Sequence, residues 1–320
     1  MRRAGVAIVA AVVLVALLAP ALTPNTPDFR FPDRAYAPPM PLRVVGADGR
    51  WRTPFVYPVR LADRLERRYE EDRSNPVTVT WFSRGVVAQV GDERLGPWLP
   101  LGGDGSGRDV FARLVYGARL SLAVALAATL GALLIGTLVG GIAGAAGGLA
   151  DDALMRFADF VIVLPAMYVV LSLRAALPLV LPPARVFALV AGILALVGWP
   201  IVARGVRAIV AAERDRDYAH AARALGMGRG RLLVRHLLPA ARGFLTTQAT
   251  LLLPSFVLAE ATLSYVGLGF PDPAVSWGTM LQEAANVAAI ADAPWTLSPA
   301  AAIFAVVLAV NLIVQRPSSP

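Results

Sequence analysis

The side chains that could do chemistry in this chain are few, and their absence excludes several classes of protein. The sequence contains no cysteine and no lysine, and its histidines are His220 and His236. Without cysteine there is no thiolate metal site, cysteine nucleophile or disulfide. Without lysine there is no P-loop and no Schiff-base enzyme. Two histidines without an evident third ligand do not make a zinc site. We therefore expect no catalytic residue and no metal site, and a solvated or interface role for both histidines.

Two carboxylates stand within otherwise apolar segments and are candidates for a pathway through a membrane. A charge in such a position is costly, so Asp159 and Glu260 are candidate functional residues. For Asp159 we favour a structural pairing, with Arg156 three residues earlier as the candidate partner, over a proton relay. Glu260 could face a water-filled path or a partner chain. Carboxylates this sparse argue against a proton-coupled secondary transporter.

The elements that must position these residues are apolar segments long enough to cross a bilayer. The 320 residues are 57% hydrophobic and 16% charged, whereas a soluble domain averages about 45–50% apolar and about 25% charged residues. A spanning helix needs about 20 mostly apolar residues. The sequence therefore predicts an all-α polytopic membrane protein with six transmembrane helices, at 4–22, 120–142, 154–173, 186–202, 244–266 and 299–314.

This pattern divides the chain into three regions, namely an N-terminal transmembrane helix (1–22), an extracytoplasmic insertion (23–117) and a five-helix domain (118–316). The first region also has the composition of a signal peptide, but Pro20 and the later spans favour an uncleaved helix.

The insertion is polar, charged and rich in proline, which is typical of a solvated region. Leu61, Leu65 and Tyr69 recur at four-residue spacing and predict a short surface helix. The β-rich runs 77–82 and 86–90, on either side of Ser83-Arg84-Gly85, predict a hairpin.

Arginine in the short loops predicts the orientation. Residues 203–242 hold nine arginines against three acidic residues, so this loop carries +6 of the chain's net +8. Basic loops stay in the cytoplasm, whereas long segments cross regardless of their charge. We therefore expect loop 203–242 and both termini to be cytoplasmic and the insertion to lie outside. Headgroup contact explains part of this charge, and no nucleic acid is needed to explain it.

Glycines at four-residue spacing mark one face of the second predicted span. Gly136, Gly140 and Gly144 let another helix backbone approach closely. Ordinary helix packing is the favoured interpretation, and a helix that slides within a transport bundle is the alternative.

Loop 203–242 itself predicts two short helices. Residues 213–224 have helical composition, Gly226 interrupts it, and residues 231–238 form a second helix that Pro239 ends. The small residues Ala219, Ala221 and Ala222 form a face that suits docking into a groove of another protein, with arginines at its rim.

These residues carry a resemblance to a known family. The stretch resembles the EAA signature of permease subunits of bacterial ABC importers, in which a glycine follows six residues after a glutamate and a Leu-Pro pair closes the segment. The matching positions are His220, Ala221, Ala222, Arg223, Gly226, Leu238 and Pro239. His220 stands where the family usually has glutamate.

The resemblance continues over residues 99–315. Residues 101–119 are similar to the stretch before the second span in the dipeptide, oligopeptide and nickel subfamily, with Gly103 in place of the usual threonine. Residues 260–269 and 276–281 are similar to its later signatures, and the "C-type" permease is the best match. The insertion is longer than is usual in this subfamily.

The resemblance implies a MetI-like permease core in the bacterial inner membrane that forms half of a translocation pathway for peptides or similar small solutes. It implies a second homologous permease, two ABC ATPase subunits that hold ATP and Mg, and an extracytoplasmic substrate-binding protein. It also implies that the signature residues carry the coupling to the ATPase, and that this chain is a transport subunit rather than an enzyme.

Other interpretations of the same residues stay open. The chain could be a membrane scaffold protein or a transporter of another class. A phosphate cradle at 102–107 lacks the lysine and preceding strand that it would need. An intramembrane enzyme needs a nucleophile and a base facing each other within the spans, and both histidines lie in the loop. The transported solute is not readable from the sequence.

Overall fold

The structure is a computed structural model that describes residues 2–46, 49–64, 66–83, 85–90, 97–178, 181–285 and 287–314. The chain divides into two compact units. Residues 1–121 and 264–313 form the first unit, and residues 122–263 make up the body of the second.

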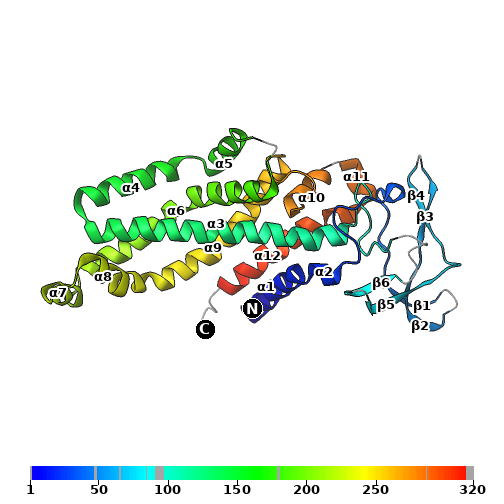
Figure 1. Cartoon of the computed structure of the whole chain (residues 1–320), viewed down its shortest axis with the longest axis horizontal. Helices are drawn as coiled ribbons and strands as arrows, with labels where there is room; N and C mark the ends of the chain where they lie inside the picture. Colours follow the sequence, from blue (N-terminus) through cyan, green and yellow to red (C-terminus); the bar gives the residue numbers. More distant parts are fainter. Residues whose placement is uncertain are drawn as a thin grey trace, which may run out of the picture. The chain divides into compact units, whose positions relative to one another are not determined.

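Two apolar helices pack together in the first unit. Helix α1 (Arg2–Leu17) is followed by the single turn α2 (Ala19–Leu22), and α12 (Ser298–Val314) ends the unit. A Cβ added at Gly5 would overlap the carbonyl oxygen of Ala309 and lie 2.9 Å from the Ile313 side chain. The start of α1 therefore contacts the end of α12, and the two helices run antiparallel (Figure 1).

The insertion in this unit is a small β domain, where the sequence predicted a solvated region with one short surface helix and one hairpin. Its strands include a four-stranded sheet in the order β1-β2-β5-β6 and a separate antiparallel pair, β3-β4. Its small core consists of Val56 of β2, Val77 and Val79 of β5, and Ala88 of β6, with the partly buried Val90 and Trp98 packed against them. The strands are β1 (Arg43–Val45), β2 (Trp51–Val56), β3 (Val59–Asp63), β4 (Arg68–Glu71), β5 (Val77–Ser83) and β6 (Val86–Val90).

One prediction for the insertion is confirmed and one is wrong. The hairpin is present as β5–β6, with Trp81 opposite Ala88 and Ser83 opposite Val86; Arg84 of its turn lies outside the described residues. The helix predicted around Leu61 and Tyr69 is instead the β3–β4 hairpin, in which these two residues face each other. A spacing of four is also a multiple of the strand period of two, so the pattern fits both structures. Leu65 lies outside the described residues.

The second unit is helical. It contains α3 (Val110–Ala146) from residue 122 onward and α9 (Arg242–Tyr265) up to residue 263. Between them lie α4 (Gly148–Val163), α5 (Ala166–Ala175), α6 (Pro183–Arg214), α7 (Asp217–Ala224) and α8 (Arg229–Leu232). In the first unit, α10 (Trp277–Glu283) and α11 (Val287–Asp292) precede α12.

The described residues contain four helices that are long and apolar enough to cross a membrane, at 110–146, 183–214, 229–265 and 294–314. Each contains most or all of one predicted span. A fifth candidate is the pair α4–α5, and α1 is a shorter apolar helix. The chain is thus mostly helical, with strands in the insertion.

The third predicted span is not one straight helix. Helices α4 and α5 are bent by 85° at a short break. Leu164 is extended and Pro165 caps α5. A residue before proline is driven out of the helical region by the proline ring, which explains the break that the continuous apolar pattern did not indicate.

The glycine face of α3 packs on α6. A Cβ at Gly136 would lie 2.5 Å from the Val202 side chain, one at Gly140 would overlap the Ala203 carbonyl oxygen, and one at Gly144 would lie 2.8 Å from the Arg207 carbonyl oxygen. The two helices run side by side (Figure 1). The four-residue spacing thus produces close backbone approach, the favoured interpretation.

We predict that Gly140→Ala lowers the free energy of unfolding by about 1–3 kcal/mol, because the added methyl group forces α3 and α6 apart. The matched control is Gly192→Ala in α6, where a Cβ meets no atom within 4 Å and alanine favours the helix by about 1 kcal/mol. Thermal unfolding in detergent compares the two variants. Equal melting temperatures would contradict close packing at Gly140.

Candidate functional site

The signature residues of the loop lie on and around α7. His220, Ala221 and Arg223 are exposed and Ala222 is half-buried. Ala219, which the sequence grouped with them, is fully buried. The small face therefore divides, with Ala219 packed inward and Ala221 at the surface.

Gly226 ends α7 in a left-handed turn. Its φ is +83°, a conformation that glycine adopts without steric cost. The Met227 N–H donates to the Ala222 carbonyl at 3.0 Å and the Gly226 N–H donates to the Arg223 carbonyl at 2.9 Å. This pair of bonds is the Schellman motif of helix ends, so Gly226 forms the turn between α7 and α8.

Pro239 does not end the second short helix, contrary to the sequence prediction. From α8 the helical backbone continues through a π turn (Leu233–Leu237) and a 3₁₀ turn (Leu238–Ala241) into α9. Pro239 occupies the first turn of a new helical segment. A proline there loses no hydrogen bond, because the first N–H groups of a helix have no partner within it.

Arginines join α7 to the long helices of the second unit. Arg223 donates through Nε to the Ala219 carbonyl at 3.3 Å and through Nη2 to the Arg214 carbonyl at the end of α6. Arg214 in turn donates to the Gly144 carbonyl of α3 at 3.0 Å. A chain of contacts therefore runs from α7 to α6 and α3.

The surface beside α7 is both apolar and basic. Leu225 is 89% exposed and Val234 is 68% exposed. A pocket of about 340 Å³ on this side of the second unit presents three guanidinium groups, one carboxylate and four apolar side chains. Its lining is Ala145, Ala146, Arg214, Asp215, Arg223, Arg229, Leu232 and Leu237. Such a surface suits a partner that brings apolar and acidic side chains.

The histidines lie near this surface. The His236 ring is 6.4 Å from the ring of Tyr218, whose hydroxyl donates to Glu213 at 2.8 Å. Among the described residues, no group of three or more His, Cys, Asp or Glu side chains could hold a metal ion.

Two carboxylates of α4 pair with arginines of α6. Asp159 accepts a hydrogen bond from Arg204 Nε at 2.8 Å, and the buried Asp151 accepts from Arg207 Nε at 2.9 Å. The structural pairing of Asp159 is thus present, but the predicted partner Arg156 is wrong. Packing of α4 against α6 brings a longer-range arginine to the carboxylate, which the i−3 spacing could not indicate.

Glu260, the second pathway candidate, lies in α9 and has no exposed surface. Asp159 is about half exposed. A role for either residue in a translocation pathway stays a prediction.

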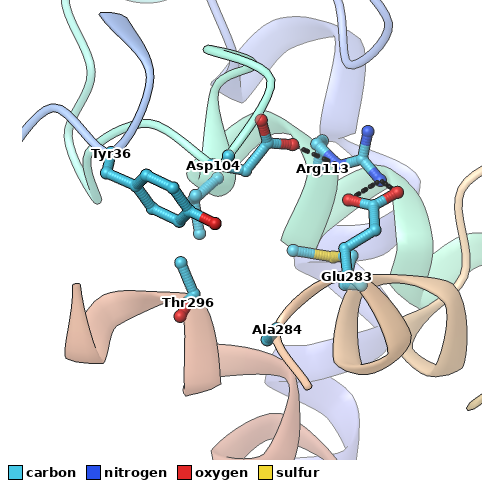
Figure 2. Close-up of a pocket in the computed structure, with 9 residues that line it drawn as sticks. Tyr36, Asp104, Arg113, Glu283, Ala284 and Thr296 are labelled. Carbon is cyan, nitrogen blue, oxygen red and sulfur yellow. Dashed lines mark hydrogen bonds and ion pairs between the residues drawn. The ribbon is translucent and has the colours of Figure 1, made fainter. Parts of the chain in front are cut away.

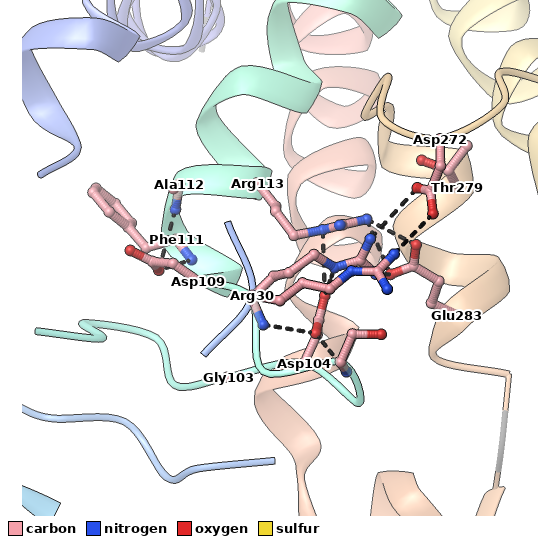
Figure 3. A network of polar contacts seen from close by, with 12 residues as sticks. Arg30, Gly103, Asp104, Asp109, Phe111, Ala112, Arg113, Asp272, Thr279 and Glu283 are labelled. Atoms are coloured by element: carbon pink, nitrogen blue, oxygen red, sulfur yellow. Dashed lines mark hydrogen bonds and ion pairs between the residues drawn. The ribbon is translucent and has the colours of Figure 1, made fainter. Parts of the chain in front are cut away.

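The first unit holds a partly buried cluster of charges, made of Asp104, Arg108, Arg113 and Glu283. Figure 3 labels Asp104, Arg113 and Glu283 of this cluster. Arg108 contacts Asp104 at 2.8 Å and Glu283 at 2.6 Å, and Arg113 contacts Glu283 at 2.8 Å. The two arginine side chains are only 6% and 2% exposed. Burial raises the pKa of the Glu283 carboxyl, and the two guanidinium groups oppose this rise. The cluster ties α10 to the segment before α3.

The pocket beside this cluster is small. Figure 2 shows Tyr36, Asp104, Arg113, Glu283 and Thr296 around it. Its volume is about 20 Å³, enough for about one water molecule. This volume indicates a structural cluster rather than a site for a transported solute.

Asp109 begins α3 and is fully buried. Its Oδ1 accepts from the N–H groups of Phe111 and Ala112, as an N-cap does, and its Oδ2 accepts from Asn25 Nδ2 at 2.8 Å. Burial raises the pKa of Asp109 to about 6, although Asn25 and the two amides oppose the rise.

Two of the stretches that carried the sequence resemblance meet in this unit. The Trp277 indole donates to the Leu114 carbonyl at 3.0 Å, and its backbone N–H donates to Ser121 Oγ at 3.1 Å. Ser276 caps α10 in a reciprocal capping box with Thr279. Gly117 lies close to both Ser276 and Trp277.

Sequence reasoning did not identify Glu283 as a partner of the two arginines. Arg108 and Arg113 lie five residues apart at the start of an apolar helix, and buried arginines require an acidic partner. The need for an acidic partner could have been inferred from the sequence. Its identity could not, because Glu283 follows Arg113 by 170 residues.

The chain is similar to known proteins over its helical part. The family described as "Binding-protein-dependent transport system inner membrane component" matches residues 117–316. A protein of Brucella ovis named as a peptide permease is 39% identical over 213 residues, which are 66% of this chain and 68% of that protein. The oligopeptide transport permease OppC of Bacillus subtilis is 37% identical over 61% of this chain and 62% of its own length.

The dipeptide transport permease DppC of Alkalihalophilus pseudofirmus is 39% identical over 66% of this chain and 67% of its own length. Among solved structures, a chain from inward-facing forms of the MetNI methionine ABC transporter matches with 18% identity and a TM-score of 0.44, over 64% of this chain and 98% of that chain.

We predict that Asp109→Asn removes part of the pH dependence of stability. A carboxyl whose pKa rises from 3.8 to about 6 on folding keeps its proton in the folded state while the unfolded chain loses it. Stability therefore falls as pH rises from about 4 to about 6, by roughly 2–3 kcal/mol. Asparagine keeps the N-cap but has no proton to lose. Unfolding of both proteins at pH 4.5 and pH 7 measures the difference, and equal differences would contradict the raised pKa.

Proposed function

Because the chain belongs to the family of binding-protein-dependent transport inner membrane components, we propose that it couples to its ATPase through α7 and the turn at Gly226. It is a membrane-spanning permease subunit of an ATP-driven importer, and it is not an enzyme. ATP and Mg bind to separate ATPase chains, which agrees with the lack of lysine in this one.

One observation carries the coupling proposal. Helix α7 exposes Ala221 and the end of its turn at Leu225, yet its Arg223 side chain holds the last carbonyl of α6. A partner that contacts this small, exposed face therefore acts directly on a long helix. The basic pocket beside α7 supplies charges at the rim of the same surface.

The route into the membrane follows from the same contacts. A displacement of α7 by the ATPases would move Arg214 and hence α6. The pairs Arg207–Asp151 and Arg204–Asp159 would carry α4 with it, and the glycine contact would carry α3. Such rigid-body movement of packed helices is how alternating access proceeds.

The transported solute is proposed from the relatives. Three similar proteins are named as peptide, oligopeptide and dipeptide permeases. We therefore propose peptides or similar small solutes, selected largely by an extracytoplasmic substrate-binding protein. A second homologous permease, two ABC ATPase subunits and membrane lipid complete the set of partners.

The chain is a multi-pass inner-membrane protein, and its detailed topology is part of the proposal. We assign six spans by counting α4–α5 as one and adding α1, which packs along α12. Both termini and α7 then lie in the cytoplasm, and the β domain lies outside, as the arginine distribution indicates.

We predict that Ala221→Asp uncouples ATPase activity from uptake or prevents ATPase association, because a carboxylate desolvated at a small, close contact is costly. Membrane insertion should not change, since Ala221 is exposed. The matched control is Ala62→Asp on strand β3, also exposed. Uptake in proteoliposomes and co-purification of the ATPase measure the effect.

Unchanged uptake in Ala221→Asp would overturn the coupling role of α7. A purified wild-type chain that brings down no ATPase would instead favour the membrane scaffold, or a transporter of another class.

A topology experiment tests the orientation separately. A reporter inserted after Arg235 should be cytoplasmic, and one inserted after Asn75 in the β domain should be extracytoplasmic. The charge rule and six spans both require this result. The opposite pattern would overturn the proposed topology.

A further inference from the structure

The end of the β5–β6 hairpin exposes two aromatic side chains. Phe82 is 83% exposed and Trp81 is 48% exposed, whereas Phe55 and Tyr57 of the same domain are buried. Phe82 also has a φ of +52°, a conformation that bulky side chains rarely adopt. These two aromatic side chains therefore point outward, although the domain has a core that buries other aromatic side chains.

The position of this hairpin is fixed within the first unit. Strand β6 packs against α2, the turn that directly follows α1. Figure 1 shows α2 between the strands and α1. At Gly5 the start of α1 meets the end of α12, and the two helices are antiparallel. The end of α1, and α2 after it, therefore lie at the end of the pair where α12 starts.

The end of α1, next to α2 in the chain, exposes apolar side chains. Leu14, Leu17 and Leu18 at the end of α1 are 57%, 66% and 45% exposed. In the proposed topology these residues face the outer half of the bilayer. Strand β6 has five residues and a strand rises about 3.3 Å per residue, so the aromatic end of the hairpin lies within about 17 Å of the contact with α2.

We propose that Trp81 and Phe82 insert into the outer interfacial layer of the bilayer, beside the end of α1, and anchor the β domain to the membrane surface. The proposal rests on the proposed topology. Tryptophan favours the level of the lipid headgroups, where its apolar ring and its polar N–H are both accommodated. Phenylalanine is common among the apolar side chains that interfacial segments bury in the bilayer. The partner is thus the lipid surface itself.

A protein partner is the competing occupant, and the location argues against it. Both aromatic residues lie on the hairpin whose second strand, β6, contacts α2. In the proposed topology α2 lies at the outer surface of the bilayer, so lipid is within reach of this hairpin. Insertion would also account for a strained Phe82 that contributes little to the core.

Site-directed spin labelling tests the proposal in the whole transporter reconstituted in lipid nanodiscs. The chain has no cysteine, so Phe82→Cys, Leu14→Cys and Ser74→Cys each carry the single thiol of this subunit. The transporter with the wild-type form of this chain, treated with the same label, gives the background signal from cysteines of the partner chains. Ser74 is the matched control, because it is exposed and precedes β5, whose other end holds Phe82.

Collision rates with oxygen, which concentrates in lipid, and with a water-soluble nickel chelate give the depth of each label. We expect the nickel accessibility at Phe82 and Leu14 to be roughly threefold or more below that at Ser74. A label at Phe82 as accessible to nickel as that at Ser74, with Leu14 in lipid, overturns the anchor and leaves the topology intact. A water-exposed Leu14 overturns both.

A protein contact gives a different result. If the Phe82 label is shielded from nickel only after the substrate-binding protein is added, the hairpin binds that protein and the bilayer proposal is overturned. Shielding that is already complete without the binding protein supports the bilayer.

Discussion

The close approach of α3 and α6 is the contact on which the second unit depends. Three glycines on one face of α3 leave no room for even a methyl group against α6. In lipid, apolar surface gives no drive for helices to associate, so close packing and polar contacts must hold them together. Small residues at strict spacing are therefore a structural requirement here, and each added atom at this face would displace the longest helices of the unit.

Because α6 packs closely against its neighbours, its arginines reach acceptors on other helices. Arg207 and Arg204 reach the two carboxylates of α4, and Arg214 reaches the Gly144 carbonyl beside the glycine face. Asp151 is buried, and removing the partner of a buried charge is costly, so the Arg207–Asp151 pair resists separation when α6 moves. The same helix then ends in the carbonyl that Arg223 of α7 holds. The packed face of α3, the ion pairs of α6 and the contact with α7 are thus connected to one another.

Local patterns predicted what depends on local physics. The Gly136, Gly140 and Gly144 spacing indicated the packed face, Gly226 indicated the turn, and the hairpin of the insertion was read from its β-rich runs. Long-range pairing was not predictable: Asp159 binds Arg204 instead of its neighbour Arg156. The helix predicted from the spacing of Leu61 and Tyr69 was also wrong, since this spacing fits a strand as well as a helix.

The described β strands lie within residues 43–90, outside the region 117–316 that the family shares. None of the contacts that join α7 to α6, α4 and α3 involves a residue of these strands. Changes in the β domain therefore leave these contacts of α7 intact. Arg108 and Glu283 pair within the first unit and hold the segment before α3 against α10. This pair and the contacts of α7 are therefore separate sets, one in each unit, so a change that breaks one set leaves the contacts of the other in place.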